Sequence, residues 1–94
     1  LLSIVQKIPI ELRVGYMFGI PTIYLQKKPV GCYHKERVIL YFTKERLTEA
    51  LKVKDSNLWE SLRGGSAMKN WVAFQGETYK KVLKLFEEEV NELI

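Results

Sequence analysis

The chain contains very few of the residues that build disulfides, metal sites and nucleophilic active sites. It has one cysteine, Cys32, and one histidine, His34, among 94 residues. A single cysteine excludes an internal disulfide and gives no sign of an oxidising compartment, so we expect a cytoplasmic protein. Long apolar runs are lacking too. The longest, residues 38–42 (VILYF), is far shorter than the ~20 residues of a membrane-spanning helix, and no signal or transit pattern is visible. We therefore expect no membrane partner.

Prolines and glycines are also scarce, at three and six, whereas 47% of the residues are hydrophobic. This composition excludes global disorder and predicts one folded domain over residues 1–94 with one core. The chain begins with Leu rather than Met, so we expect that a segment preceded it.

The net charge is +4, but residues 1–69 carry twelve basic and six acidic side chains, and residues 70–94 carry three basic and five acidic ones. This asymmetry fits a nucleic-acid face, and equally a dimer whose opposite charges meet.

Hydrophobic periodicity predicts a helix followed by four strands. Apolar residues at positions 1, 4, 5 and 8 form a helical stripe that Pro9 ends. After residue 12 come four β-prone segments, RVGYMFG, IPTIYLQ, PVGCYH and RVILYF. The links between them are short, which implies antiparallel neighbours. Ile23 and Leu25 are expected on one face of this meander, and Thr22 and Tyr24 on the other.

The second half of the chain predicts a helix, a strand and a final helix. The first of these helices follows Thr43, whose hydroxyl is expected to cap its first turn, and buries Leu47, Ala50 and Leu51. Residues 54–66 are expected to form a turn, a short helical or irregular segment and a glycine stop. A strand over residues 67–74 then leads through Gly76 to the last helix.

The last helix has the clearest apolar stripe, with Phe86 at its centre, so we expect Phe86 in the core. Its lysines come first and its glutamates last, the reverse of what the helix dipole favours. An external partner would explain this order, as would chance, and the glutamates at 87–89 are expected on a solvated face. The predicted fold is α+β, with two layers and the order α-β-β-β-β-α-β-α. Helices cover an antiparallel sheet made of the four-strand meander and one later strand.

The segment GGSAMKNWVAF, residues 64–74, has the composition of a phosphate-binding loop. It lacks the GxxxxGK[ST] spacing and leads into a strand rather than a helix, so we interpret it as a glycine turn feeding a strand. Alternation places Val72 and Phe74 on one face of that strand and Trp71 and Ala73 on the other. Trp71 is therefore expected to be partly exposed or to lie at a contact between subunits.

Cys32 and His34 lie two residues apart on one strand and form the one conceivable catalytic dyad. Nothing nearby would orient the histidine, and a small buried cysteine with a histidine at a strand end explains both residues. Two such ligands do not make a zinc site, and the carboxylates are scattered. We expect no metal, no cofactor and no small-molecule ligand.

Four basic residues flank the turns of the meander: Lys27, Lys28, Lys35 and Arg37. Basic side chains beside aromatic rings are what a single-stranded nucleic acid would use, although turns are also where proteins commonly place lysines. No RNP-type pattern or helix-turn-helix is visible. These four residues and Trp71 are the candidate contacts for nucleic acid or for a protein partner.

In their order along the chain, the segments YMFGIPTIYL, VGCYHKERVILYF, KERLTEAL and GSAMKNWVAF, followed by an amphipathic helix, resemble the N-terminal domain of the TfoX/Sxy competence regulators and their stand-alone relatives. Ile20 and Pro21 stand where that family commonly has another glycine, and Ala67 stands where it commonly has proline. The resemblance implies an α+β domain similar to secretion-chaperone and YjbR-like folds. It also implies a link to gene regulation, with no catalytic motif.

We therefore expect a small non-enzymatic module for regulation or protein interaction. Its partner is expected to be a protein, and a second copy of the chain, forming a homodimer, is one such partner. The alternative is a nucleic-acid-binding protein that uses the basic turns, and the remote alternative is a small hydrolase acting through Cys32 and His34.

Overall fold

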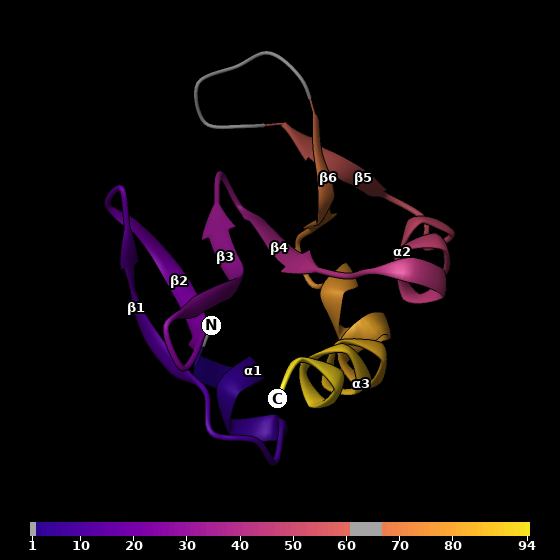
Figure 1. Ribbon diagram of the computed structural model, residues 1–94. Coiled ribbons are helices and arrows are strands. Elements are labelled where there is room, and N and C mark those ends of the chain that lie inside the picture. Colours follow the sequence, from indigo (N-terminus) through magenta and orange to yellow (C-terminus); the bar gives the residue numbers. More distant parts are fainter. Residues whose placement is uncertain (1, 61–66) are drawn as a thin grey trace.

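The described residues form one antiparallel sheet of six strands with three α-helices, an α+β fold (Figure 1). The structure is a computed structural model that describes residues 2–60 and 67–94. The strands lie in the order β1-β2-β3-β4-β6-β5, a meander extended by β6 and β5. The elements are α1 (Leu2–Lys7), β1 (Arg13–Met17), β2 (Ile20–Leu25), β3 (Lys28–His34), β4 (Arg37–Tyr41), α2 (Lys44–Leu51), β5 (Ser56–Glu60), β6 (Ala67–Gln75), the 3-10 helix η1 (Thr78–Val82) and α3 (Leu83–Leu93).

Three tight hairpins build the meander, as the short links predict. Two residues separate the strands in each hairpin, at positions 18–19, 26–27 and 35–36. Each loop contains at least one residue with a positive φ, including Phe18 at 53° and Gly19 at 76°. Two positive φ angles in succession give a loop whose twist matches that of the flanking strands.

Helices cover one face of the sheet, and the main core lies between the two layers (Figure 1). Phe86 of α3 is fully buried, as the apolar stripe predicts. Its ring packs edge-on against Phe42 at 6.1 Å, and Phe42 packs edge-on against Phe74 at 6.3 Å. The packing of α3 against the sheet thus brings three aromatic rings into edge-on contact in the main core.

A second, smaller cluster lies on the opposite face and contains strand residues alone: Ile20, Cys32, Ile39, Trp59 and Ala73. Trp71 packs against this cluster, whereas its sequence neighbour Val72 belongs to the main core. The alternation predicted for the strand at residues 67–74 is therefore confirmed.

A β-bulge in β3 moves side chains from one face to the other. Ile23 pairs with Gly31 while Tyr24 pairs with Pro29, which leaves Val30 as the extra residue. As a result Val30 lies in the main core and Cys32 lies in the opposite cluster, although they are two residues apart.

The prediction of a short helical or irregular segment around Leu58 and Trp59 is wrong, because these residues belong to the strand β5. β5 pairs with β6, and its Trp59 is buried over the second cluster. Packing against β6 therefore outweighs the weak local preference of this segment. The predicted glycine stop falls within residues 61–66, outside the described part of the chain.

Two expectations for α2 and one for α3 are also corrected. The Thr43 hydroxyl does not cap α2 but donates a hydrogen bond to Glu89. Leu51 is exposed rather than buried, since α2 packs through Ala50 and Leu47. Glu89, expected on a solvated face, is buried because the N-terminal end of α2 lies against it.

Candidate interaction surface

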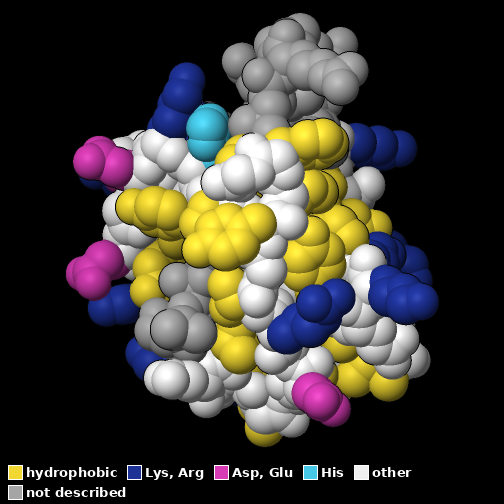
Figure 2. Space-filling model, turned by 90° about the vertical axis from the view of Figure 1, so that its left-hand side faces the viewer, with side chains coloured by type: hydrophobic (Ala, Val, Ile, Leu, Met, Phe, Trp, Pro, Cys, Tyr) yellow, Lys and Arg dark blue, Asp and Glu magenta, His cyan; other side chains and the backbone are white. Residues whose placement is uncertain are grey.

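The hairpin of β1 and β2 exposes large apolar side chains. Tyr16 and Phe18 are 73% and 80% exposed, and Val14 is exposed as well; Tyr33 of the neighbouring strand β3 is also exposed. Figure 2 shows hydrophobic side chains gathered on the side of the molecule where β1 and β2 lie, with charged side chains mainly around them. Exposed apolar side chains that gather on one surface mark an interaction site more often than those that are scattered. We call Val14, Tyr16 and Phe18 the hairpin surface.

The backbone of β1 forms the edge of the sheet at this surface. Among the described residues, no strand pairs with its outer side. In a hairpin with a two-residue loop, the residues that close the loop exchange hydrogen bonds, here Met17 and Ile20. Every second residue of β1 then faces β2, so the amide and carbonyl groups of Val14 and Tyr16 point away from the sheet.

The side chain of Tyr24 on β2 contacts the middle of β1. A Cβ atom at Gly15 would lie 3.0 Å from Cε2 of the Tyr24 ring, so this ring covers the glycine. The Tyr24 hydroxyl donates to the Tyr16 carbonyl at 3.3 Å, which leaves the second lone pair of that oxygen for another donor. The Tyr16 carbonyl therefore has one partner within the chain and can still accept from another strand.

Beyond Arg13 at its start, β1 carries few of the usual protections of an edge strand. Its sequence, RVGYM, contains neither lysine nor proline, and its register with β2 is continuous. The opposite edge, β5, carries a register shift between Leu58 and Glu60 and has the polar residues Ser56 and Asn57 at its start. The two edge strands thus differ in regularity. β1 has a continuous register, so it is the edge better suited to pair with another strand.

Phe18 lies at a costly position for its residue type. A φ of 53° in a two-residue loop favours Asn, Asp or Gly. Apart from Gly19, the other positive-φ residues of these loops are polar: Gln26, Lys35 and Glu36. Sequence reasoning missed Tyr16 and Phe18 as site residues. The signal was present, because an aromatic residue in a two-residue loop has little to pack against.

The four predicted basic residues do not form one patch. Lys27 and Lys28 lie at one end of β3, and Lys35 and Arg37 lie at the other. Seven residues of strand at ~3.3 Å each separate the two pairs by roughly 20 Å. Lys28 and Arg13 instead lie over aromatic rings, with the Lys28 ammonium 4.9 Å from the centre of the Tyr41 ring.

Trp71, the fifth predicted contact, is half-buried on the face away from the helices. Its ring packs edge-on against Tyr41 at 5.5 Å and lies tilted 6.4 Å from Trp59. The expectation of partial exposure is therefore met within the single chain, with two neighbouring rings supplying part of its cover.

Cys32 is fully buried in the second cluster. Burial raises the pKa of its thiol to about 12, so the nucleophilic thiolate is very scarce at neutral pH. His34 lies further along β3, half-buried beside Arg37. In the described part of the chain, no group of three or more His, Cys, Asp or Glu side chains could hold a metal ion.

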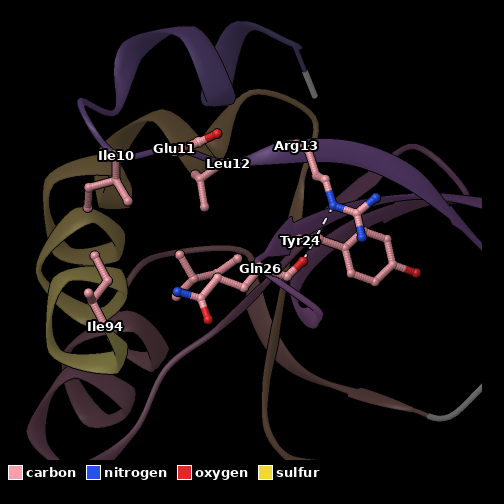
Figure 3. Close-up of a pocket in the computed structure, with 8 residues that line it drawn as sticks. Ile10, Glu11, Leu12, Arg13, Tyr24, Gln26 and Ile94 are labelled. Carbon is pink, nitrogen blue, oxygen red and sulfur yellow. Dashed lines mark hydrogen bonds between the residues drawn. The ribbon is translucent and has the colours of Figure 1, made fainter.

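A shallow cleft of about 500 Å³ lies between the start of β1, the β2–β3 turn and the last residue of the chain (Figure 3). Ile10 and Ile94 line one end of it. At the other end Arg13 extends over the Tyr24 ring, 5.0 Å from its centre, and its Nε donates to the Gln26 carbonyl at 3.4 Å. The cleft places Arg13 at the rim of the sheet.

Comparisons with known proteins yielded no significant match to a family model, a curated protein or a solved structure. None of the described helices is both long and apolar enough to span a membrane.

Proposed function

We propose that the chain is a small protein-interaction module that associates with a second copy of itself through the edge of β1. The observation that carries this proposal is Phe18, a large apolar residue that is 80% exposed in a backbone conformation unfavourable for it. Little of this side chain is buried within the chain, and its backbone conformation is unfavourable, which supports a role in a contact outside the chain.

The β1 strand is complementary to itself. If two copies pair antiparallel about Gly15, Val14 of each copy lies opposite Tyr16 of the other. The outward backbone groups of these two residues then exchange hydrogen bonds, and their side chains form two apolar cross-strand pairs. Such an interface is isologous, since each copy contributes the same strand β1 with Phe18 directly after it, and it closes at two copies.

This pairing is small, so the dimer is expected to be weak. Contacts well below ~1,200 Å² of total buried area are typical of transient complexes. A dissociation constant in the micromolar range corresponds to roughly 8 kcal/mol of binding free energy. The module is therefore expected to exchange between monomer and dimer at ordinary cellular concentrations.

We further propose that the chain is related to the N-terminal domain of the TfoX/Sxy regulators, on the basis of the order of its sequence segments. This relationship would imply a role in regulation rather than catalysis. The buried, protonated thiol of Cys32 supports a non-enzymatic role, because it removes the nucleophile from the one dyad in the described chain.

The first test is Phe18→Asn, measured by sedimentation velocity over a range of concentrations together with urea denaturation. Asn accepts the left-handed conformation more readily, so this variant is expected to be more stable by about 0.5 kcal/mol while dimerising at least several-fold more weakly. A stability gain with unchanged self-association would show that Phe18 has no part in the contact.

The second test compares Val14→Lys with Leu58→Lys. Both residues are 37% exposed and lie on edge strands, at opposite edges of the sheet. Val14→Lys is expected to give a monomer, since a lysine on the paired face opposes strand addition, and Leu58→Lys is expected to dimerise as the wild type does. A monomeric wild type at high micromolar concentration, or equal effects of both substitutions, would overturn the proposal.

A further inference from the structure

One residue from each of the six strands contributes to a row of rings and cations across the sheet. The residues are Arg13, Tyr24, Lys28, Tyr41, Trp71 and Trp59, from β1, β2, β3, β4, β6 and β5 respectively. We call them the basic–aromatic row. The measured contacts between them are Arg13 over Tyr24 at 5.0 Å, Lys28 over Tyr41 at 4.9 Å, Tyr41 against Trp71 at 5.5 Å and Trp71 against Trp59 at 6.4 Å.

Strand pairing places the rings of the row on one face. Tyr41 pairs directly with Trp71, and Tyr24 alternates with Thr22, which pairs with Cys32 of the second cluster. Directly paired residues project to the same side of a sheet. By pairing and alternation Tyr24, Tyr41 and Trp71 project to the face opposite the helices, and Tyr41 packs against the main core as well; all three are half-buried. Lys28 pairs with Leu25 of the main core, and its ammonium reaches the Tyr41 ring from the end of β3.

The two cations of the row, Arg13 and Lys28, lie against aromatic rings and not against carboxylates. Arg46 and Lys44 pair with Glu89 and Glu92, and Lys52 and Lys80 each pair with a glutamate three residues away. Arg13 and Lys28 form no salt bridge with a carboxylate in the described residues and lie against rings instead, although both are exposed. Their charge is held in place on the surface without being neutralised.

We propose that this row binds single-stranded nucleic acid. Cations fixed on a sheet can contact phosphates, while the accessible ring of Trp71 and the guanidinium plane of Arg13 can stack on unpaired bases. Lys69 adds a further exposed cation two residues before Trp71 on the same strand. A duplex would present no base faces to these groups, so single strands are the expected ligand.

Charge supports the same ligand. Residues 1–69, which contain every member of the row except Trp71, carry twelve basic and six acidic side chains. Part of this surplus lies on the row itself and on its neighbour, since Arg13, Lys28 and Lys69 are exposed cations of the sheet and offer electrostatic attraction to a phosphate chain. The row differs from the five contacts expected from sequence. It retains Lys28 and Trp71, leaves out Lys27, Lys35 and Arg37, and adds Arg13, Tyr24, Tyr41 and Trp59.

The test is fluorescence anisotropy of the intact chain with labelled oligo(dT) and oligo(rU) of about 20 nucleotides and with a duplex of equal length. We expect micromolar binding of the single strands at ~50 mM salt that weakens steeply by ~200 mM. Lys28→Gln is expected to lower affinity roughly fivefold and to reduce the salt slope by about 0.7. Lys35→Gln removes the same charge at the other end of β3 and serves as the matched control, with affinity within a factor of two of the wild type.

A second measurement reports on stacking. In a Trp59→Phe background Trp71 is the one remaining tryptophan, and its fluorescence is expected to be quenched on addition of oligo(dT). Circular dichroism melts establish that each variant is folded, and Lys28→Gln changes an exposed side chain, so it tests the proposal even if the tryptophan variant is unstable. Absence of salt-sensitive binding, equal loss with Lys35→Gln, or duplex binding as tight as single-strand binding would each overturn the assignment.

Discussion

Glu89 of α3 caps the N-terminus of α2 from 46 residues away by binding both donors of Thr43. Its Oε1 accepts the Thr43 backbone N–H at 2.7 Å, and its Oε2 accepts the Thr43 hydroxyl at 2.7 Å. Arg46 Nε donates to Oε1 at 3.0 Å, while its Nη2 pairs with Glu92. The glutamates that end α3 against its own dipole are therefore placed for a partner within the chain, the positive end of α2.

Replacement of Glu89 by Gln is expected to destabilise the fold by about 2 to 4 kcal/mol, because the side chain is 1% exposed and accepts three hydrogen bonds. The N–H₂ group of the new glutamine would face the donors of Thr43 and Arg46, so it would find no hydrogen-bond acceptor there. Urea denaturation measures the change. Glu88→Gln, an exposed neighbour on the same helix, is the control and should shift stability by less than about 0.5 kcal/mol; equal effects at the two positions would contradict the capping role.

The pair formed by Arg46 and Glu92 predicts a loss of stability in acid. Hydrogen bonds from Arg46 and then Lys44 lower the pKa of Glu92 below its ordinary value of 4.5. A carboxyl whose pKa is lower in the folded state stabilises the fold above the unfolded-state pKa, and the contribution disappears as pH falls through the folded-state pKa. The stability difference between wild type and Glu92→Gln is therefore expected to be constant well above pH 4.5, to decline below that pH, and to vanish once the pH has fallen through the lower folded-state pKa. A difference that persists in strong acid would show that the ion pair is not its source.

Cys32 is expected to be inert toward a disulfide reagent in the folded protein. Its side chain is fully buried and its pKa is raised to about 12, so the thiolate is roughly a 10⁻⁵ fraction at pH 7. Labelling in native buffer should be slow, while labelling in urea should be rapid and stoichiometric. Fast labelling of the native chain at neutral pH would instead revive the Cys32 and His34 dyad as a catalytic hypothesis.

Phe86→Ala is expected to cost roughly 3 to 5 kcal/mol, since it removes a fully buried ring that packs against Phe42. This is a large part of the ~5 to 15 kcal/mol that stabilises an ordinary domain. Phe86→Leu, at about 1 to 2 kcal/mol, keeps the measurement possible if the alanine variant unfolds. Leu85→Ala, at a half-buried neighbour, should cost less than Phe86→Ala; the reverse order would place α3 differently against the sheet.

Sequence reasoning predicted the elements whose signal is local. Alternation placed Val72 and Phe74 in the main core and Trp71 on the opposite face, and helical spacing identified Phe86 as a core residue. Short links predicted the three hairpins. These features depend on side-chain periodicity and on the reach of a few residues of chain, both of which can be read from neighbouring positions.

Pairing between distant segments decided the rest, because its energy depends on partners that no local pattern reveals. β5 is a strand because β6 lies beside it, and the bulge at Val30 separates Cys32 from the face that simple alternation would give it. The sheet order brings Trp71 against Tyr41 and holds Lys28 a full strand length from Lys35. The sequence by itself thus determined which residues are apolar, basic or strand-forming, and the tertiary structure determined which of them meet, since only the packed sheet sets the distances between them.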